Sequence, residues 1–248
     1  MIGVLSLDVK SIDYGSFELN NEFGENMGNF SATDQIITLG IGRILNRSFS
    51  IGANLSLLNS NYESYNSLAL SSNIATTYIN MNKKMASTLI LKNIGKQLNK
   101  YNNSEDLPFE MQFAISKVLL HLPFRYHVSY NYINTFNIKS PYKLIQQTNF
   151  ETGNLEIVEE TIAKTFLRHI TIGGELNPFK RSFYLRAGFN FQRRFDLSLD
   201  TYPAMVGFSW GIGFKISKFR FDYGRVSYHL SNTPNHFSIG TKLSTFGL

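Results

Sequence analysis

The chain has 248 residues with 24 lysines and arginines, 18 aspartates and glutamates, a formal net charge of +6, and no cysteine. The lack of cysteine excludes disulfides, thiol chemistry and cysteine-ligated metals. No stretch approaches the roughly 20 apolar residues of a membrane-spanning helix, and the basic residues are scattered, which argues against a nucleic-acid-binding patch.

Large apolar residues recur at every second position along most of the chain, separated by glycine, serine and other small or polar residues. This period of two is typical of β-strands whose faces meet different environments. In chain order the predicted strands are residues 2–10, 35–43, 48–58, 67–79, 85–94, 109–116, 124–132, 168–176, 183–192, 206–216, 219–230 and 236–243. We therefore expect about twelve strands, each near the roughly 9 to 11 residues that cross a bilayer at a tilt.

The connections between these strands alternate between short and long. The short ones are 44–48, 80–84, 119–123, 177–181 and 217–218; the long ones are 11–34, 59–66, 95–108, 133–167, 193–204 and 231–235. Outer-membrane barrels have this asymmetry, with short periplasmic turns and long extracellular loops. An even strand count that begins and ends on the short-turn side predicts that both termini are periplasmic. Within the loop 133–167, helical spacing of apolar residues predicts a short helix at about 155–167.

The apolar face of the strongest strands is bulky and free of charge. Its predicted lipid-facing residues are Phe183, Leu185, Phe189, Phe191, Val206, Phe208, Trp210, Ile212, Phe214, Phe219 and Phe221. A soluble β-sandwich would bury such residues and cover its outer face with charge, and a water-soluble calyx barrel would turn them inward. In lipid, where a midplane lysine or arginine costs roughly 2 to 4 kcal/mol, they belong outside. The sequence thus predicts a transmembrane, antiparallel, up-and-down β-barrel as a single domain, residues 1–248.

The opposite register of the strands is polar and rich in glycine. Its ionisable residues predict a charge network inside the barrel, formed by Glu110, Arg125, His127, Glu175, Arg186, Arg220 and Asp222. Networks of this kind keep a barrel interior polar or plugged, and they are weak support for transport.

The penultimate predicted strand carries an irregularity in its alternation. Its apolar positions change from Phe219, Phe221 and Tyr223 to Val226 and Tyr228, so they shift by one residue. A β-bulge adds one residue to a strand and restores the face of the side chains that follow. We therefore expect a bulge at Gly224–Arg225.

No catalytic arrangement is evident in the sequence. The five histidines do not fall into metal-binding spacings. The segment "LGIGRIL" has Leu45 where a dinucleotide-binding motif requires glycine, and neither a nucleophile elbow nor a Walker motif is present. We therefore expect a non-enzymatic protein without cofactor or metal.

The long loops contain aromatic residues that could bind a partner, since aromatic side chains are favoured anchors in interfaces. The candidates are Tyr101, Phe136, Tyr142, Phe150, Phe195 and Tyr202. An aromatic girdle at the level of the lipid headgroups is an alternative role for several of them.

Several segments together resemble the PorQ family, outer-membrane proteins of the type IX secretion system of Bacteroidetes-type bacteria. The segments are "ATDQIITLGIGRILNRSFSIGANL", "LILKNIGKQL", "LPFEMQFAISKVLLHLPFRYHVSYNYI", "FYLRAGFNFQRR" and "MVGFSWGIGFKISKFRFDYGRVSYHLSNTPNHFSIGTKL". The resemblance runs from about residue 15 to the end in the family's order, and the last part of the chain is its most specific portion. The family is related to PorV and more distantly to FadL-type channels, whose barrels have about fourteen strands. About twelve strands here imply that the signal peptide and first mature segment of such a protein are missing.

This resemblance implies a non-enzymatic role in a cell-surface attachment complex with PorZ, PorU and PorV, in which cargo is processed and joined to lipopolysaccharide. The barrel would anchor PorZ at the outer membrane, and the proteolysis and transfer would belong to PorU. The alternative is a FadL-like channel for small hydrophobic molecules. The polar inward register disfavours this channel, because it needs an apolar pocket.

Overall fold

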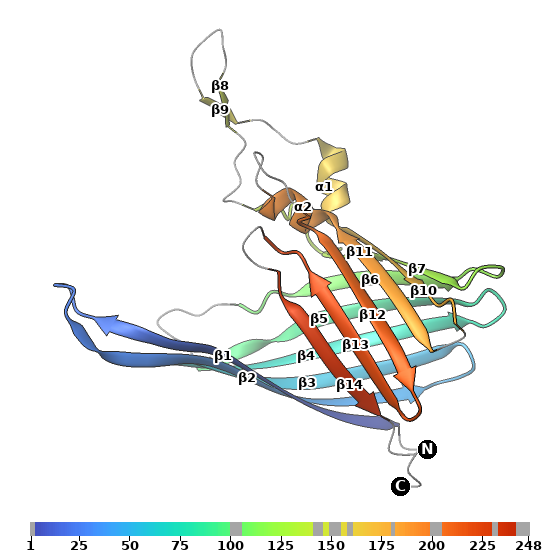
Figure 1. Ribbon diagram of the computed structural model, residues 1–248, viewed down its shortest axis with the longest axis horizontal. Helices are drawn as coiled ribbons and strands as arrows, with labels where there is room; N and C mark the ends of the chain where they lie inside the picture. The colour runs from blue at the N-terminus through green and yellow to red at the C-terminus, as the bar shows by residue number, and fades with distance from the viewer. Residues whose placement is uncertain are drawn as a thin grey trace. The chain divides into compact units, whose positions relative to one another are not determined.

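The computed structural model describes residues 3–99, 106–140, 146–148, 155–157, 161–179, 182–198, 205–229 and 233–241 (Figure 1). Twelve antiparallel strands form one sheet whose order follows the chain from β1 to β7 and then from β10 to β14, and β8 pairs with β9 separately. The predicted all-β class, the strand number and the up-and-down topology are confirmed. In the described residues, no helix has the length and apolar character needed to cross a membrane.

The strands of the main sheet are β1 (Val4–Asn20), β2 (Asn26–Ile44), β3 (Phe49–Tyr62), β4 (Tyr65–Asn80), β5 (Met85–Asn99), β6 (Glu110–Val118), β7 (Phe124–Tyr130), β10 (Ile170–Leu176), β11 (Phe183–Asn190), β12 (Phe208–Ile216), β13 (Phe219–Val226) and β14 (Asn235–Thr241). The remaining elements are β8 (Gln146–Thr148), β9 (Leu155–Ile157), α1 (Ile162–Arg168) and α2 (Phe191–Leu197).

The chain divides into two compact units. Unit 1 comprises Met1–Ile79 and Thr88–Met111, and therefore contains β1 to β4 with most of β5. Unit 2 comprises Asn80–Ser87 and Gln112–Leu248, and contains most of β6, all later strands and both helices.

The predicted short turns are confirmed, whereas two predicted long loops are largely strand. β1 and β2 extend through most of residues 11–34, with a turn between Asn20 and Asn26. Likewise, β3 and β4 are joined by only Glu63 and Ser64, so the predicted loop 59–66 is a tight hairpin. These segments contain few alternating apolar residues, and their strands are held by cross-strand pairing that periodicity does not reveal.

The predicted helix at about 155–167 is shorter than expected. α1 begins after Thr161, and Leu155–Ile157 instead forms β9, which pairs with β8. The β9 segment contains the β-branched Ile157, and its backbone groups gain partners across the β8–β9 pair. Part of the predicted strand 183–192 is helical, because α2 starts at Phe191.

The expected bulge at Gly224–Arg225 is wrong. The β12–β13 pairing runs without a break from Ile216–Phe219 to Ser209–Val226, and the β13–β14 pairing is also regular through Arg225. β13 ends at Val226, so the later apolar residues do not continue this strand and no bulge is needed to restore the face. The short turn before it, Ser217–Lys218, is confirmed.

Candidate functional site

In β11 and β12 of unit 2, the large apolar side chains occupy one register, and the glycines and charged residues occupy the other. Phe208 and Trp210 on β12 are 45% and 46% exposed, while Gly211 and Gly213 between the apolar positions are buried. Residues that pair directly across an antiparallel sheet share a face. By this register one apolar face carries Phe183, Leu185, Phe189, Phe208, Trp210, Ile212, Phe214, Phe219 and Phe221, each exposed or half-buried. The predicted apolar face is therefore present, and its large side chains are exposed or half-buried.

Two residues predicted for this face lie elsewhere. Val206 is only 2% exposed, because the chain turns at Gly207 (φ 89°) before β12 begins. Phe191 is the first residue of α2, where its ring packs edge-on against Phe189 with centroids 4.8 Å apart. Alternation in the sequence continues past the ends of both strands, so it could not reveal where they stop.

Four of the predicted network residues meet on the opposite, polar face of unit 2. Arg186 on β11 donates from Nε to Glu175 of β10 at 2.8 Å and from Nη1 to Asp222 of β13 at 2.7 Å. Arg220 donates from Nε to the other oxygen of Asp222 at 2.7 Å. The guanidinium carbons of Arg186 and Arg220 lie 5.2 and 5.4 Å from the centroid of the Tyr184 ring. The cluster therefore joins three strands through charge-assisted hydrogen bonds and cation–π contacts.

Glycine in β12 makes this network possible. Arg186 and Asp222 sit on β11 and β13, so their ion pair crosses β12, where Gly213 lies between the two strands. A Cβ on Gly213 would come within 2.5 Å of Asp222 Oδ1 and 3.1 Å of Arg186 Nη1. The small residue thus leaves the space through which the two side chains meet.

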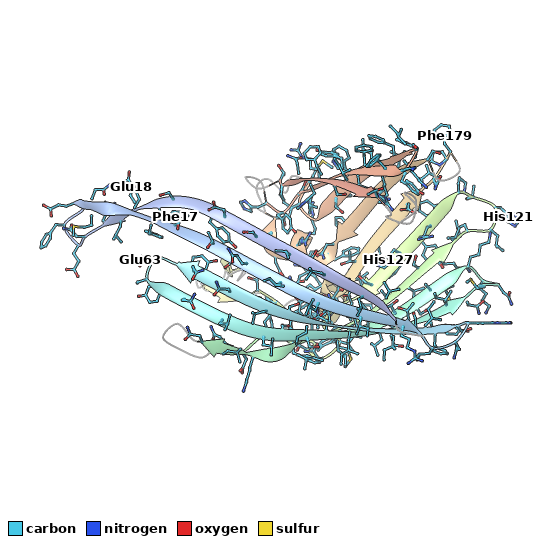
Figure 2. The ribbon with its side chains drawn as sticks, turned by 90° about the horizontal axis from the view of Figure 1, so that it is seen from below. Phe17, Glu18, Glu63, His121, His127 and Phe179 are labelled. Atoms are coloured by element: carbon cyan, nitrogen blue, oxygen red, sulfur yellow. The ribbon has the colours of Figure 1, made fainter. Side chains whose placement is uncertain are left out.

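The other predicted network residues do not join this cluster. Glu110 is in unit 1, where Lys92 Nζ lies 3.4 Å from its carboxylate. Arg125 stands opposite Glu175 in the β7–β10 register, and His127 stands opposite Gly173. Figure 2 marks His127 on its strand. The sequence identified the correct face but not which charges would pair.

Replacing Gly213 by alanine should therefore break the Arg186–Asp222 bridge. We expect a loss of about 1 to 2 kcal/mol in unfolding free energy, between the values typical of exposed and buried ion pairs. Denaturant unfolding of the detergent-solubilised protein measures it.

The matched control is Gly240→Ala on β14 of the same unit, because a Cβ there has no atom within 4 Å. In an Asp222→Ala background the cost of Gly213→Ala should shrink, since the bridge is already absent. An unchanged cost in that background would show that the glycine serves some other purpose.

A cap of two short helices, α1 and α2, lies beside the ends of the unit 2 strands (Figure 1). Arg168 of α1 is buried and pairs through Nη1 with Asp196 Oδ1 of α2. The Phe195 ring lies 5.3 Å from Lys164 Nζ and 5.4 Å from the Arg168 guanidinium. A buried ion pair with a stacked ring fixes one helix against the other.

His169 fastens this cap to the sheet. It is completely buried, and its Nδ1 and Nε2 lie 2.7 and 2.9 Å from the carbonyl oxygens of Asn131 and Phe136. Its ring stacks on Tyr130 of β7 with centroids 4.8 Å apart. The segment after β7 is therefore held against the end of α1.

Of the predicted partner-binding aromatics, Phe195 belongs to α2 of the cap and Phe136 to the segment after β7. Phe136 is 56% exposed and remains available for contact, whereas Phe195 is half-buried between the helices. Exposed apolar neighbours at the helices are Ile162, Phe166 and Leu197, which the prediction did not include. The other four candidates, Tyr101, Tyr142, Phe150 and Tyr202, lie outside the described residues.

Unit 1 carries a second projecting feature that the sequence prediction treated as a loop. β2 pairs with β3 only from Ala32 onward, so residues 16–31 form a two-stranded arm (Figure 1). Phe17 of the arm, labelled in Figure 2, stacks on Phe30 with centroids 5.4 Å apart, and Phe23 at the turn is 89% exposed. The arm therefore presents an aromatic residue at its end.

The arm and its base are acidic in a chain that is basic as a whole. Between Lys10 and Arg43 the sequence has no lysine, arginine or histidine. Its acidic residues are Asp13, Glu18, Glu22, Glu25 and Asp34. This run of one charge sign was the available sequence signal for a distinct surface, and it favours contact with a basic partner.

Asp34 joins the strands at the base of the arm. Its Oδ2 accepts hydrogen bonds from the hydroxyls of Tyr14 at 2.7 Å and Tyr62 at 3.0 Å. All three residues lie outside the segments expected to span the membrane. Burial alone would raise the pKa of Asp34, but the hydroxyls of Ser60, Tyr14 and Tyr62 outweigh it and hold that pKa below its ordinary value. The hydrogen bond to Asp34 raises the pKa of Tyr14. Burial raises the pKa of Tyr62, and so do its side-chain hydrogen bonds with Tyr14 and Asp34.

The pKa shifts of Asp34, Tyr14 and Tyr62 set the pH range in which these residues stabilise the base of the arm. The lowered pKa of Asp34 adds stability above its unfolded value of about 4, which is lost as pH falls through the folded value. The raised tyrosine pKa values add stability below about pH 10, which is lost as pH rises through the folded values. Protection of β1 and β2 amides from hydrogen exchange should therefore be greatest between these limits.

Asp34→Asn should lower the ionisation pKa of Tyr14 and Tyr62 toward the ordinary tyrosine value, as followed by ultraviolet absorbance. Asp8→Asn, at an exposed position on the same hairpin, is the control. Identical titration curves for Asp34→Asn and the parent protein would contradict the role of Asp34.

Among the described residues, no group of three or more histidine, aspartate or glutamate side chains is placed to hold a metal ion. Comparison with protein-family models gives no match, and no curated protein matches the chain.

Proposed function

We propose that the protein is a non-enzymatic outer-membrane β-barrel that anchors a soluble partner at the cell surface. The observation that carries the proposal is the apolar face of the sheet, whose large side chains are exposed instead of forming a core. Among the described residues, the buried hydrophobic side chains are only Ala32, Ala69 and Val206. A face of this kind is unfavourable in water and suits hydrocarbon.

Closure of the sheet into a barrel is part of the proposal. A β-sheet in hydrocarbon must pair every backbone donor and acceptor, and closure leaves no unpaired edge. The polar face, with its network around Arg186, then faces the interior. A polar interior of this kind suits an anchor better than a channel for hydrophobic molecules.

The membrane location has a direct test in two measurements. The native protein should stay in the outer-membrane fraction after carbonate extraction. On a detergent gel, an unheated sample should also migrate faster than a heated sample, because a closed barrel resists unfolding by detergent. Release by carbonate, or identical migration in both gels, would overturn the proposal.

The partner is proposed from the resemblance to the PorQ family. In that setting the barrel binds PorZ and brings it together with PorU and PorV, which process type IX secretion cargo and attach it to lipopolysaccharide. The acidic arm and the helical cap supply the contact surfaces, because both project from the sheet and carry exposed apolar residues.

Phe23→Ser at the end of the arm should weaken partner binding about tenfold or more, as expected for an aromatic anchor. Affinity of the detergent-solubilised protein for purified PorZ measures it. Phe179→Ser, at a 68% exposed phenylalanine in the β10–β11 turn, is the matched control and should have no effect (Figure 2).

Higher salt should also weaken this binding, because the arm is acidic. If Phe23→Ser and Phe179→Ser bind equally well, the arm is not the contact. If the unaltered protein binds neither PorZ nor the PorU–PorV complex, the anchoring function is wrong.

A further inference from the structure

The apolar face of unit 2 is hollowed at one place. A cavity of about 470 Å³ lies over Gly174 and Ala187, which stand opposite each other on β10 and β11. Its large apolar lining residues are Phe124, Ile172, Leu176, Leu185, Phe189 and Phe208, and Gly173, Arg186 and Gly188 complete the lining. The Phe124 ring lies so close that a Cβ on Gly174 would come within 2.7 Å of it. The hollow is therefore a gap among large apolar side chains, open over Ala187 and bordered at Gly174 by the Phe124 ring.

The same face carries two basic residues that belong to one row across the sheet. Direct pairing links Lys117, Tyr126, Gly174, Ala187, Trp210 and Arg225 in that order, from β6 to β13. Paired residues share a face, so both cations lie on the apolar side. Neighbouring strands are about 4.8 Å apart, which places Arg225 roughly 10 Å from Ala187.

The two cations lie near the ends of their strands. Lys117 is one residue before the end of β6, beside the short turn 119–123, and Arg225 is one residue before the end of β13, away from the short turn 217–218. Arg225 is exposed and donates from Nη2 to Thr233 Oγ1 at 3.1 Å. A guanidinium has five N–H donors, so Arg225 can also bind a phosphate in a bidentate manner.

We propose that this face binds an anionic phospholipid, with an acyl chain in the hollow over Gly174 and Ala187 and the phosphate on Arg225. The inference rests on the proposed membrane location. The apolar lining matches a hydrocarbon chain, and an exposed arginine on an apolar face matches an anionic headgroup. Arg225 lies about two strand spacings from Ala187. One lipid molecule can therefore place its phosphate on Arg225 and its acyl chain over Ala187.

The test is native mass spectrometry of the full-length, detergent-solubilised protein with added phosphatidylglycerol or phosphatidylcholine that have the same acyl chains. We expect phosphatidylglycerol to be retained roughly tenfold more, because only its net charge is negative. Ala187→Phe should fill the hollow and reduce retention of both lipids. Arg225→Gln should remove the preference for phosphatidylglycerol, and free glycerophosphate should compete weakly because it lacks the chains.

Matched controls separate this site from general lipid adhesion. Ile74→Phe adds a ring at an exposed apolar position of β4 in unit 1, and Lys215→Gln removes an exposed cation from the opposite face of β12. Both should bind like the parent. Ala187→Leu is a milder filling variant, should Ala187→Phe fail to fold.

Three results would overturn the proposal. The first is equal retention of the two lipids by the parent protein. The second is an equal loss of lipid retention in Ile74→Phe and in Ala187→Phe. The third is that Ala187→Phe changes the oligomeric state of the protein without changing lipid retention. The last would assign the hollow to a second copy of the chain. Lipid binding is read only from protein that migrates as a heat-modifiable barrel, so failure of this inference is distinct from failure of the membrane proposal.

Discussion

Direct pairing across the antiparallel sheet is the constraint on which the rest of the protein depends. Because paired residues share a face, a single register sends Phe208, Trp210 and Phe214 to one side of β12 and the glycines between them to the other. Those glycines give the opposite face room for long charged side chains from neighbouring strands. Arg186 reaches Asp222 across Gly213 for this reason. Apolar exposure on one face and ion pairing on the other are thus two results of one alternation.

The projecting features follow different rules from the sheet. The cap is fixed by buried polar groups, with Arg168 paired to Asp196 and His169 placed between two backbone carbonyls. The arm, residues 16–31, consists of only two strands, and a two-stranded hairpin is marginally stable by itself in water. Stacked phenylalanines and the Asp34 hydrogen bonds at its base support it. Both features leave apolar side chains exposed.

Periodicity was sufficient where a strand is long and meets two different environments. It located the strands of the sheet, their up-and-down order and the short turns. It failed at the arm, where polar residues are paired in strands, and at Phe191, where the apolar alternation runs on into a helix. It also suggested a bulge at Gly224–Arg225, since the pattern alone could not show that β13 ends at Val226.

The sequence by itself determined the fold class and the sidedness of each strand, because alternation along a strand is a local property of the chain. It also identified most members of the charge network as residues of one face. Only the tertiary structure decided which charges meet, since Arg186 and Asp222 are distant in sequence and their pairing depends on a glycine in a third strand. The same holds for Asp34, His169 and the hollow over Ala187, each of which is formed by residues from several strands or loops brought together by pairing.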